Sequence, residues 1–132
     1  RGLGDVYKRQ FSDKTKQFGF KAVFPSGKVL ACLGDEPFNE KCRNFVQNCD
    51  YLMCEAFCLY SQKDIFKPYE KFHSTALDAG KLAESLFAKN LILYHTEDET
   101  LQTRKRTYTS EARTVFNGNI FVPDDFEVIN LK

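Results

Sequence analysis

The apolar residues of the chain recur in several places with the spacing of short strands. Between residues 18 and 24, apolar side chains alternate with smaller or polar ones, which is the period of a half-buried strand. The Pro-Ser-Gly sequence at 25–27 is a turn signal, and the apolar run 29–33 that follows it completes a predicted hairpin. The runs 51–56 and 91–94 are short and almost continuously apolar, so they predict strands that are buried on both faces.

Between these strands the spacing becomes helical. Asn39 is a suitable N-cap for a short helix that we expect to run to about residue 47. Thr75 and Asp78 resemble a capping box, and the apolar stripe that follows predicts a helix that Asn90 ends. The remaining expected elements are a loop, a helix opened by Thr109 and two closing strands, at residues 57–72, 109–116, 120–122 and 126–131. Strands that alternate with helices in this way predict an α/β fold.

Composition and charge narrow the class of protein. The chain has 132 residues, enough for one domain, and 42% hydrophobic with 28% charged residues is typical of a folded globular chain. The apolar runs are far shorter than the roughly 18 residues of a membrane span, so we expect no membrane segment and no membrane partner. The formal net charge of +1 excludes binding to nucleic acid by bulk positive charge, so any RNA contact would have to be local.

The first ten residues, RGLGDVYKRQ, differ from the rest of the chain. They show no apolar periodicity, and DVYKRQ looks like an in-frame translation of a transposase end used to prepare sequencing libraries. We therefore interpret residues 1–10 as a non-native leader and residues 11–132 as the domain; the alternative is a native, loosely ordered N-terminus. The leader carries three basic residues and one acidic residue, so leaving it out changes the net charge from +1 to −1. We expect the natural chain to continue upstream.

The cysteines indicate a reducing environment. There are five of them, an odd number, and their spacing lacks the paired C-x-x-C units of a zinc ribbon. Cys32 and Cys54 lie in apolar runs, where a reduced thiol behaves as a small hydrophobic group. We expect structural thiols and a cytoplasmic location, with Cys54 and Cys58 as metal ligands the alternative.

Polar side chains occur where the predicted buried strands end. Asp35 follows the run 29–33, Glu55 lies near the end of its strand, and His95 directly follows residues 91–94. Carboxyl ends of buried strands are where open α/β sheets hold ligands, and His73 adds an imidazole just before the capped helix. The two carboxylates and the imidazole of His95 at one sheet edge are plausible metal ligands or acid–base groups, and His73 is a second imidazole at a helix N-terminus. From these residues alone, hydrogen-bonded structural roles for each of them remain open.

The order of four motifs carries the interpretation further. They read V-L-A-C-L-G-D-E-P at 29–37, C-E-A-F at 54–57, F-H-S-T at 72–75 and L-I-L-Y-H at 91–95. In this order they resemble the second half of a metallo-β-lactamase-fold hydrolase, and most of all ribonuclease Z, the zinc endonuclease that matures the 3′ end of transfer RNA. The resemblance implies the C-terminal half of a four-layer αββα sandwich.

The resemblance also implies a role for each residue. Asp35 matches the aspartate that bridges two zinc ions, and His95 matches the last metal-binding histidine. His73 matches the histidine that contacts the scissile phosphate and aids protonation of the leaving group. Glu55 matches the glutamate of H-E-A-T, which orients that histidine. The implied partner is a transfer RNA precursor, and a homodimer is the implied assembly.

The chain also departs from the family pattern. Cys54 stands where the family has His, Phe57 stands where it has Thr, and no H-x-H-x-D-H motif occurs in the sequence. Because two ligands do not hold a dinuclear site, we expect these 132 residues alone to bind zinc weakly and to hydrolyse nothing.

Two alternatives to an RNA endonuclease stay open. One is a hydrolase of the same fold that acts on small phosphodiesters or esters, and the other is a degenerate, metal-free binding module. The cluster Arg104-Lys105-Arg106 could touch phosphate, although a solvated lead-in to a helix is the expectation we favour. A half domain would also leave one apolar sheet face uncovered.

Overall fold

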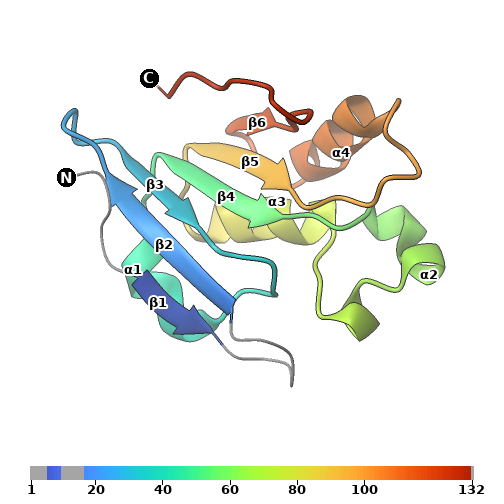
Figure 1. Cartoon of the computed structure of the whole chain (residues 1–132), viewed down its shortest axis with the longest axis horizontal. Helices are drawn as coiled ribbons and strands as arrows, with labels where there is room; N and C mark the ends of the chain where they lie inside the picture. The colour runs from blue at the N-terminus through green and yellow to red at the C-terminus, as the bar shows by residue number, and fades with distance from the viewer. Residues whose placement is uncertain (1–5, 10–16, 132) are drawn as a thin grey trace.

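A mixed sheet forms the centre of the molecule. The computed structural model describes residues 6–9 and 17–131, and Figure 1 shows their arrangement. Six strands pair in their order along the chain, so each strand lies beside its neighbours in sequence. Their bounds are β1 Val6–Arg9, β2 Gln17–Val23, β3 Val29–Cys32, β4 Tyr51–Glu55, β5 Asn90–Tyr94 and β6 Asn119–Phe121.

β2 runs antiparallel to both of its neighbours, β1 and β3. The predicted hairpin is confirmed, because β2 and β3 pair antiparallel, with Phe20 opposite Cys32. From β3 onward all pairs are parallel, as expected of buried strands joined by helices. The carboxyl ends of β3, β4 and β5 therefore meet at one edge of the sheet (Figure 1).

The first strand falls in the segment that we interpret as a leader. β1, Val6–Arg9, pairs antiparallel with β2 at the outer edge of the sheet. Because this pairing uses backbone groups that any sequence carries, it is compatible with a non-native leader as well as with a native one. The origin of residues 1–10 stays a prediction.

The helices begin where their caps predict. The Asn39 side chain accepts a hydrogen bond from the backbone of Lys41 and opens a 3-10 turn, Glu40–Cys42, followed by α1, Arg43–Val46. The predicted capping box is confirmed at the start of α3, Ala76–Ser85. α3 ends at Ser85, earlier than the expected end at Asn90. The reason is that Phe87 has a left-handed backbone (φ 55°), which a helix cannot continue through.

Three further segments differ from their predictions. The expected loop 57–72 contains short helical turns: η2 Tyr60–Gln62, α2 Lys63–Phe66 and η3 Tyr69–Lys71. α4 spans Arg104–Arg113 and starts five residues before Thr109, because its first turn is polar and gives no apolar period, although Arg and Lys favour helices. The expected closing strand 126–131 is not a strand, since it has no neighbouring strand to pair with among the described residues.

Among the described residues, helices cover one face of the sheet and leave the other without a helix. In Figure 1, α3 lies behind β4 and β5, and it also contacts α4. The core between them is formed by alternate residues of the strands and small residues of α3, among them Leu52, Leu91, Ala79 and Ala83, all fully buried. Gly80 keeps α3 close to α4, because a Cβ there would lie 2.9 Å from the carbonyl oxygen of Ala112.

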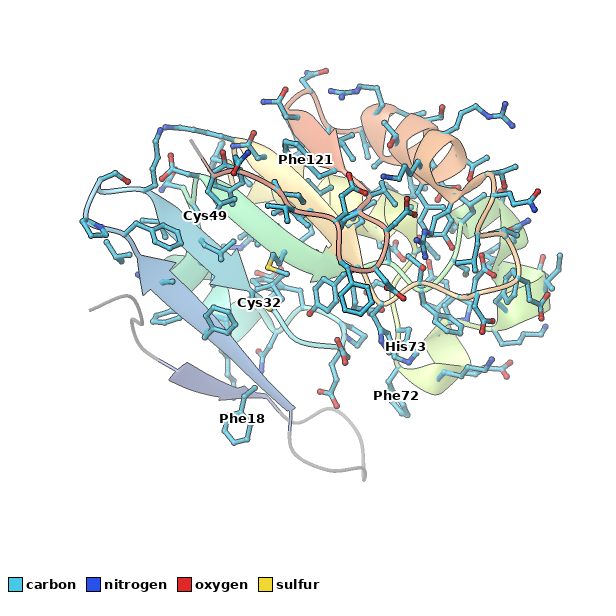
Figure 2. All side chains as sticks on the ribbon, turned by 45° about the horizontal axis from the view of Figure 1, so that its top comes forward. Phe18, Cys32, Cys49, Phe72, His73 and Phe121 are labelled. Atoms are coloured by element: carbon cyan, nitrogen blue, oxygen red, sulfur yellow. The ribbon has the colours of Figure 1, made fainter. Side chains whose placement is uncertain are left out.

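The opposite face is apolar and incompletely covered. It carries the other set of alternating residues, in which Tyr51 and Ile92 are buried whereas Leu30, Met53 and Phe121 are only half-buried. Phe18 of β2, which also belongs to this face by its register, is 54% exposed and points away from the sheet edge in Figure 2. An uncovered apolar face is what a half domain predicts.

No helix among the described residues is long and apolar enough to cross a membrane.

Candidate functional site

Four side chains predicted from the sequence meet at the carboxyl edge of the sheet. Asp35 follows β3, Glu55 is the last residue of β4, His95 follows β5, and His73 precedes the cap of α3. The imidazole rings of His73 and His95 lie 4.9 Å apart, centroid to centroid. Figure 2 shows His73 beyond the arrowheads of the parallel strands. Residues 60 positions apart in the sequence thus form one cluster.

Glu55 is a buried carboxylate that holds the segment carrying His73. Its side chain is 1% exposed, and one oxygen accepts a hydrogen bond of 2.6 Å from the backbone N–H of Ser74. The other oxygen lies 3.3 Å from Nδ1 of His73, and these two buried atoms face each other without a hydrogen bond to any of the described residues. A carboxylate buried in this way is stable only when such groups surround it. The pair therefore fixes His73 by its Nδ1 edge.

Phe57 fixes the same imidazole by its face. The two rings are stacked, with centroids 4.9 Å apart and planes 23° apart. On Phe57 itself, Phe66 of α2 packs edge-on and the Lys71 ammonium lies 5.2 Å from the ring centroid. This residue departs from the family motif, and its contact with His73 was not predicted from the sequence. No local sequence signal reveals it, because the stacking depends on the path of the loop 57–72.

Asp35 and His95 form a second, more open pair. Oδ2 of Asp35 lies 3.8 Å from Nδ1 of His95, and both side chains are about two-fifths exposed. Both residues lie at or next to left-handed backbone positions, which few side chains tolerate. Asp35 directly follows Gly34, which has φ 80°, and His95 itself has φ 56°. Left-handed backbone in a non-glycine residue is strained and recurs at functional sites.

The turn that carries Asp35 needs its glycine for a second reason. A Cβ at position 34 would lie 2.9 Å from the carbonyl oxygen of Phe18, which is too close. The Tyr94 hydroxyl donates a 2.7 Å hydrogen bond to the Gly34 carbonyl and thereby ties the end of β5 to the end of β3. Burial, together with the neighbouring Cys32 thiol and Asp35, raises the pKa of Tyr94, so its hydroxyl remains a donor.

The donor atoms of Asp35 and His95 fit a zinc ion as two of its ligands. Zinc bonds to carboxylate oxygen and imidazole nitrogen at about 2.0–2.2 Å, so two atoms 3.8 Å apart can contact the same ion. Within residues 6–9 and 17–131, however, no group of three His, Cys, Asp or Glu side chains could hold a metal. A four-coordinate zinc site would need further ligands from outside this part of the chain.

The cysteines, of which Cys54 and Cys58 were the alternative metal ligands, lie in surroundings that suit structural thiols. All five cysteines are reduced, with no disulfide between them, and four of them are buried. Burial raises the pKa of Cys49 to about 11 and that of Cys58 to about 12, so both stay protonated thiols at neutral pH. Cys58 pairs with Thr75 in an isolated β-bridge and belongs to no metal-binding group of the described residues.

The basic cluster 104–106 contacts the C-terminal segment. The Arg104 guanidinium lies 3.0 Å from Asp124, and the Lys105 ammonium lies 3.3 Å from Asp124 and also contacts Glu127. Two of its three charges are thus paired within the chain. These residues form the first turn of α4 instead of leading into it, and Lys105 and Arg106 are exposed, as expected of a solvated segment.

Comparison with known proteins identifies the fold class of the chain. No family model matches the chain. In structure, it matches the metallo-β-lactamase fold protein YhfI from Bacillus subtilis with a TM-score of 0.71 and 18% identity, covering 89% of this chain and 46% of that one. It matches the short form of human tRNase Z with a TM-score of 0.71 and 23% identity, covering 99% of this chain and 44% of that one. The chain thus has part of the metallo-β-lactamase fold, as predicted.

Within that class the sequence is similar to ribonucleases Z. It is 28% identical over 130 residues to the ribonuclease Z of Bacillus cereus strain B4264, covering 92% of this chain and 42% of that protein. It is 32% identical over 98 residues to the ribonuclease Z of Bacillus thuringiensis strain Al Hakam, covering 74% of this chain and 31% of that protein. The chain spans less than half the length of these relatives, which agrees with a half domain.

Proposed function

We propose that this chain is the C-terminal half of a zinc-dependent phosphodiesterase, a ribonuclease Z-like endonuclease that processes the 3′ end of transfer RNA in the cytoplasm. The observation that carries the proposal is the convergence of Asp35, Glu55, His73 and His95 at one sheet edge, in a chain similar to ribonucleases Z. We further propose that the complete protein holds two zinc ions and forms a homodimer.

Asp35 and His95 would hold zinc in this proposal. The Asp35 carboxylate offsets positive charge, and the left-handed turn at His95 directs the residue out of the strand end. When bound, zinc supplies the Lewis acidity that activates water for attack on phosphorus. The other ligands would come from a part of the protein outside these residues.

His73 would act on the phosphate and the leaving group. Glu55 engages Nδ1, so Nε2 is the ring nitrogen left to approach the substrate. A histidine held at one nitrogen by a carboxylate and at its face by Phe57 presents the other nitrogen in a fixed direction. When His73 carries a proton on both ring nitrogens, Nε2 can donate one of them to the departing ribose oxygen while Nδ1–H stays against Glu55.

Cleavage assays test the proposal and its alternatives together. We expect a longer protein, extended upstream of Phe11, to cleave a transfer RNA precursor and to lose this activity with EDTA. The 132-residue chain alone should cleave neither this substrate nor a chromogenic phosphodiester. Faster turnover of the chromogenic compound than of the precursor would favour a small-ester hydrolase. If the longer protein cleaved neither, the binding-module alternative would replace the proposal.

A further inference from the structure

A cavity lies beside His73, on the face of the sheet that the helices cover. Its volume is about 430 Å³, and His73 and Ser74 form part of its wall. Cys54 of β4 and Leu82 of α3 contribute apolar surface, and Lys81 lines it from the exposed side of α3. The cavity is separate from the Asp35–His95 pair, yet His73 borders both. A ligand that reaches His73 can therefore extend into the cavity.

Two aromatic rings from separate segments also line this cavity. Phe38 precedes the first 3-10 turn and has the Arg43 guanidinium 5.8 Å from its ring centroid. Tyr69 belongs to η3, and its hydroxyl donates a 2.8 Å hydrogen bond to Asp78. Burial and this hydrogen bond raise the pKa of Tyr69 to about 12, so the donor stays protonated at neutral pH. Both rings are thus held in place before any ligand arrives.

We propose that this cavity binds the nucleobase of a nucleotide adjacent to the phosphate that His73 contacts. The inference rests on the proposed function, because it assumes a phosphodiester substrate at His73. The volume is within the usual range for small-ligand sites, about 300–1,000 Å³. Aromatic side chains bind any base by stacking, so the cavity selects for the presence of a base and discriminates little among the four.

The charges around the cavity suit the same ligand. Arg43 is engaged by both carboxylate oxygens of Glu40 and by the Ser85 carbonyl, so it serves as part of the wall. Lys81 forms no ion pair within the described part of the chain, and the residue is exposed. It is therefore the cation that can meet a phosphate, while the aromatic rings and apolar side chains meet the base.

Binding of simple nucleotides to the 132-residue chain tests this proposal without metal or catalysis. We expect adenosine monophosphate to bind at least tenfold more tightly than ribose 5-phosphate, measured by chemical-shift titration of the amides lining the cavity. Equal affinity of the two probes, or shifts confined to residues far from the cavity, would overturn the proposal.

Two variants of α3 locate the binding. Ser85 lines the cavity and is exposed, so Ser85→Trp should fill it and lower the affinity for adenosine monophosphate at least tenfold. Glu84→Trp, one residue earlier and outside the lining, is the matched control and should change the affinity less than twofold. Unchanged affinity in Ser85→Trp would contradict the proposal.

A second pair of variants keeps the test valid if a tryptophan disturbs folding. Tyr69→Ala should weaken the binding of adenosine monophosphate but leave the binding of ribose 5-phosphate unchanged. Lys81→Ala should weaken the binding of both compounds, and Lys41→Ala is the control at another exposed lysine. Since no hydrolysis is measured, failure of base binding leaves the proposed function standing. Loss of cleavage by the longer protein would remove that function while base binding could persist.

Discussion

At the scale of single residues, we propose that Glu55 determines how His73 is presented to a substrate. The buried carboxylate contacts Nδ1 and also accepts from the Ser74 backbone. In Glu55→Gln, the amide keeps the shape but loses the charge. We expect the Nδ1–H tautomer of His73 to dominate in the parent chain at pH 8 and to become a minority in the variant, as measured by ¹⁵N shifts of the ring. In a complete, active protein, the same change should lower kcat about 10–100-fold.

A matched control separates positioning from general destabilisation. Glu111 is another carboxylate with backbone partners, the N–H groups of Tyr60 and Leu77, but within the described residues it forms no ion pair or hydrogen bond with His73. Glu111→Gln should leave the His73 tautomer unchanged. A dominant Nε2–H tautomer in the parent chain would contradict the role that we assign to Glu55.

At the scale of elements, Asp50 joins the amino ends of the strands on which the site depends. Its carboxylate accepts a 2.8 Å hydrogen bond from the Val29 backbone and lies 3.1 Å from the Lys89 ammonium. Burial alone would raise the pKa of Asp50, but the Val29 hydrogen bond and the lysines Lys89 and Lys28 lower it below its ordinary value. The charged form is thus favoured in the folded state.

The stability contributed by Asp50 should depend on pH. Because its pKa is lower in the folded state, this contribution is complete above the unfolded pKa, about 3.9, and is lost as the pH falls through the folded pKa. We expect Asp50→Asn to lower the free energy of unfolding by about 1–2 kcal/mol at pH 7. Urea unfolding at pH 7 and pH 3 checks this, and an equal difference at both pH values would contradict it.

Local sequence signals predicted the elements whose hydrogen bonds and turns are formed between residues close together in the sequence. The Asn39 cap, the Thr75–Asp78 capping box and the hairpin 18–33 each depend on neighbours in sequence, and the structure has all of them. The start of α4 and the absence of a strand at 126–131 depend on partners far along the chain. No local period could reveal these two features.

The same division applies to the site. The edge residues Asp35, Glu55 and His95 could be predicted because parallel strands bring their carboxyl ends together. The stacking of Phe57 on His73, the Tyr94 hydrogen bond and the cavity beside α3 depend on side-chain packing between distant segments. These three features have no signature in the sequence.

At the scale of the whole molecule, the described chain has one sheet covered by helices on one face, and the two residues that we propose as zinc ligands lie at its edge. The incompletely covered apolar face and the coverage of less than half of its relatives both agree with a second sheet in the complete protein. In such an assembly the half-buried Leu30, Met53 and Phe121 would become core residues. The site would then lie at the edge where both halves contribute ligands.

Zinc content and cleavage, measured together on the longer protein, test the central claim most directly. We expect the parent to carry two zinc ions and to cleave a transfer RNA precursor. Asp35→Ala should bind less zinc and should cleave at least about 1,000-fold more slowly, since the substitution removes a proposed metal ligand. The matched control Asp64→Ala, at an exposed carboxylate of α2, should change neither. Full zinc content and undiminished cleavage in Asp35→Ala would contradict the account.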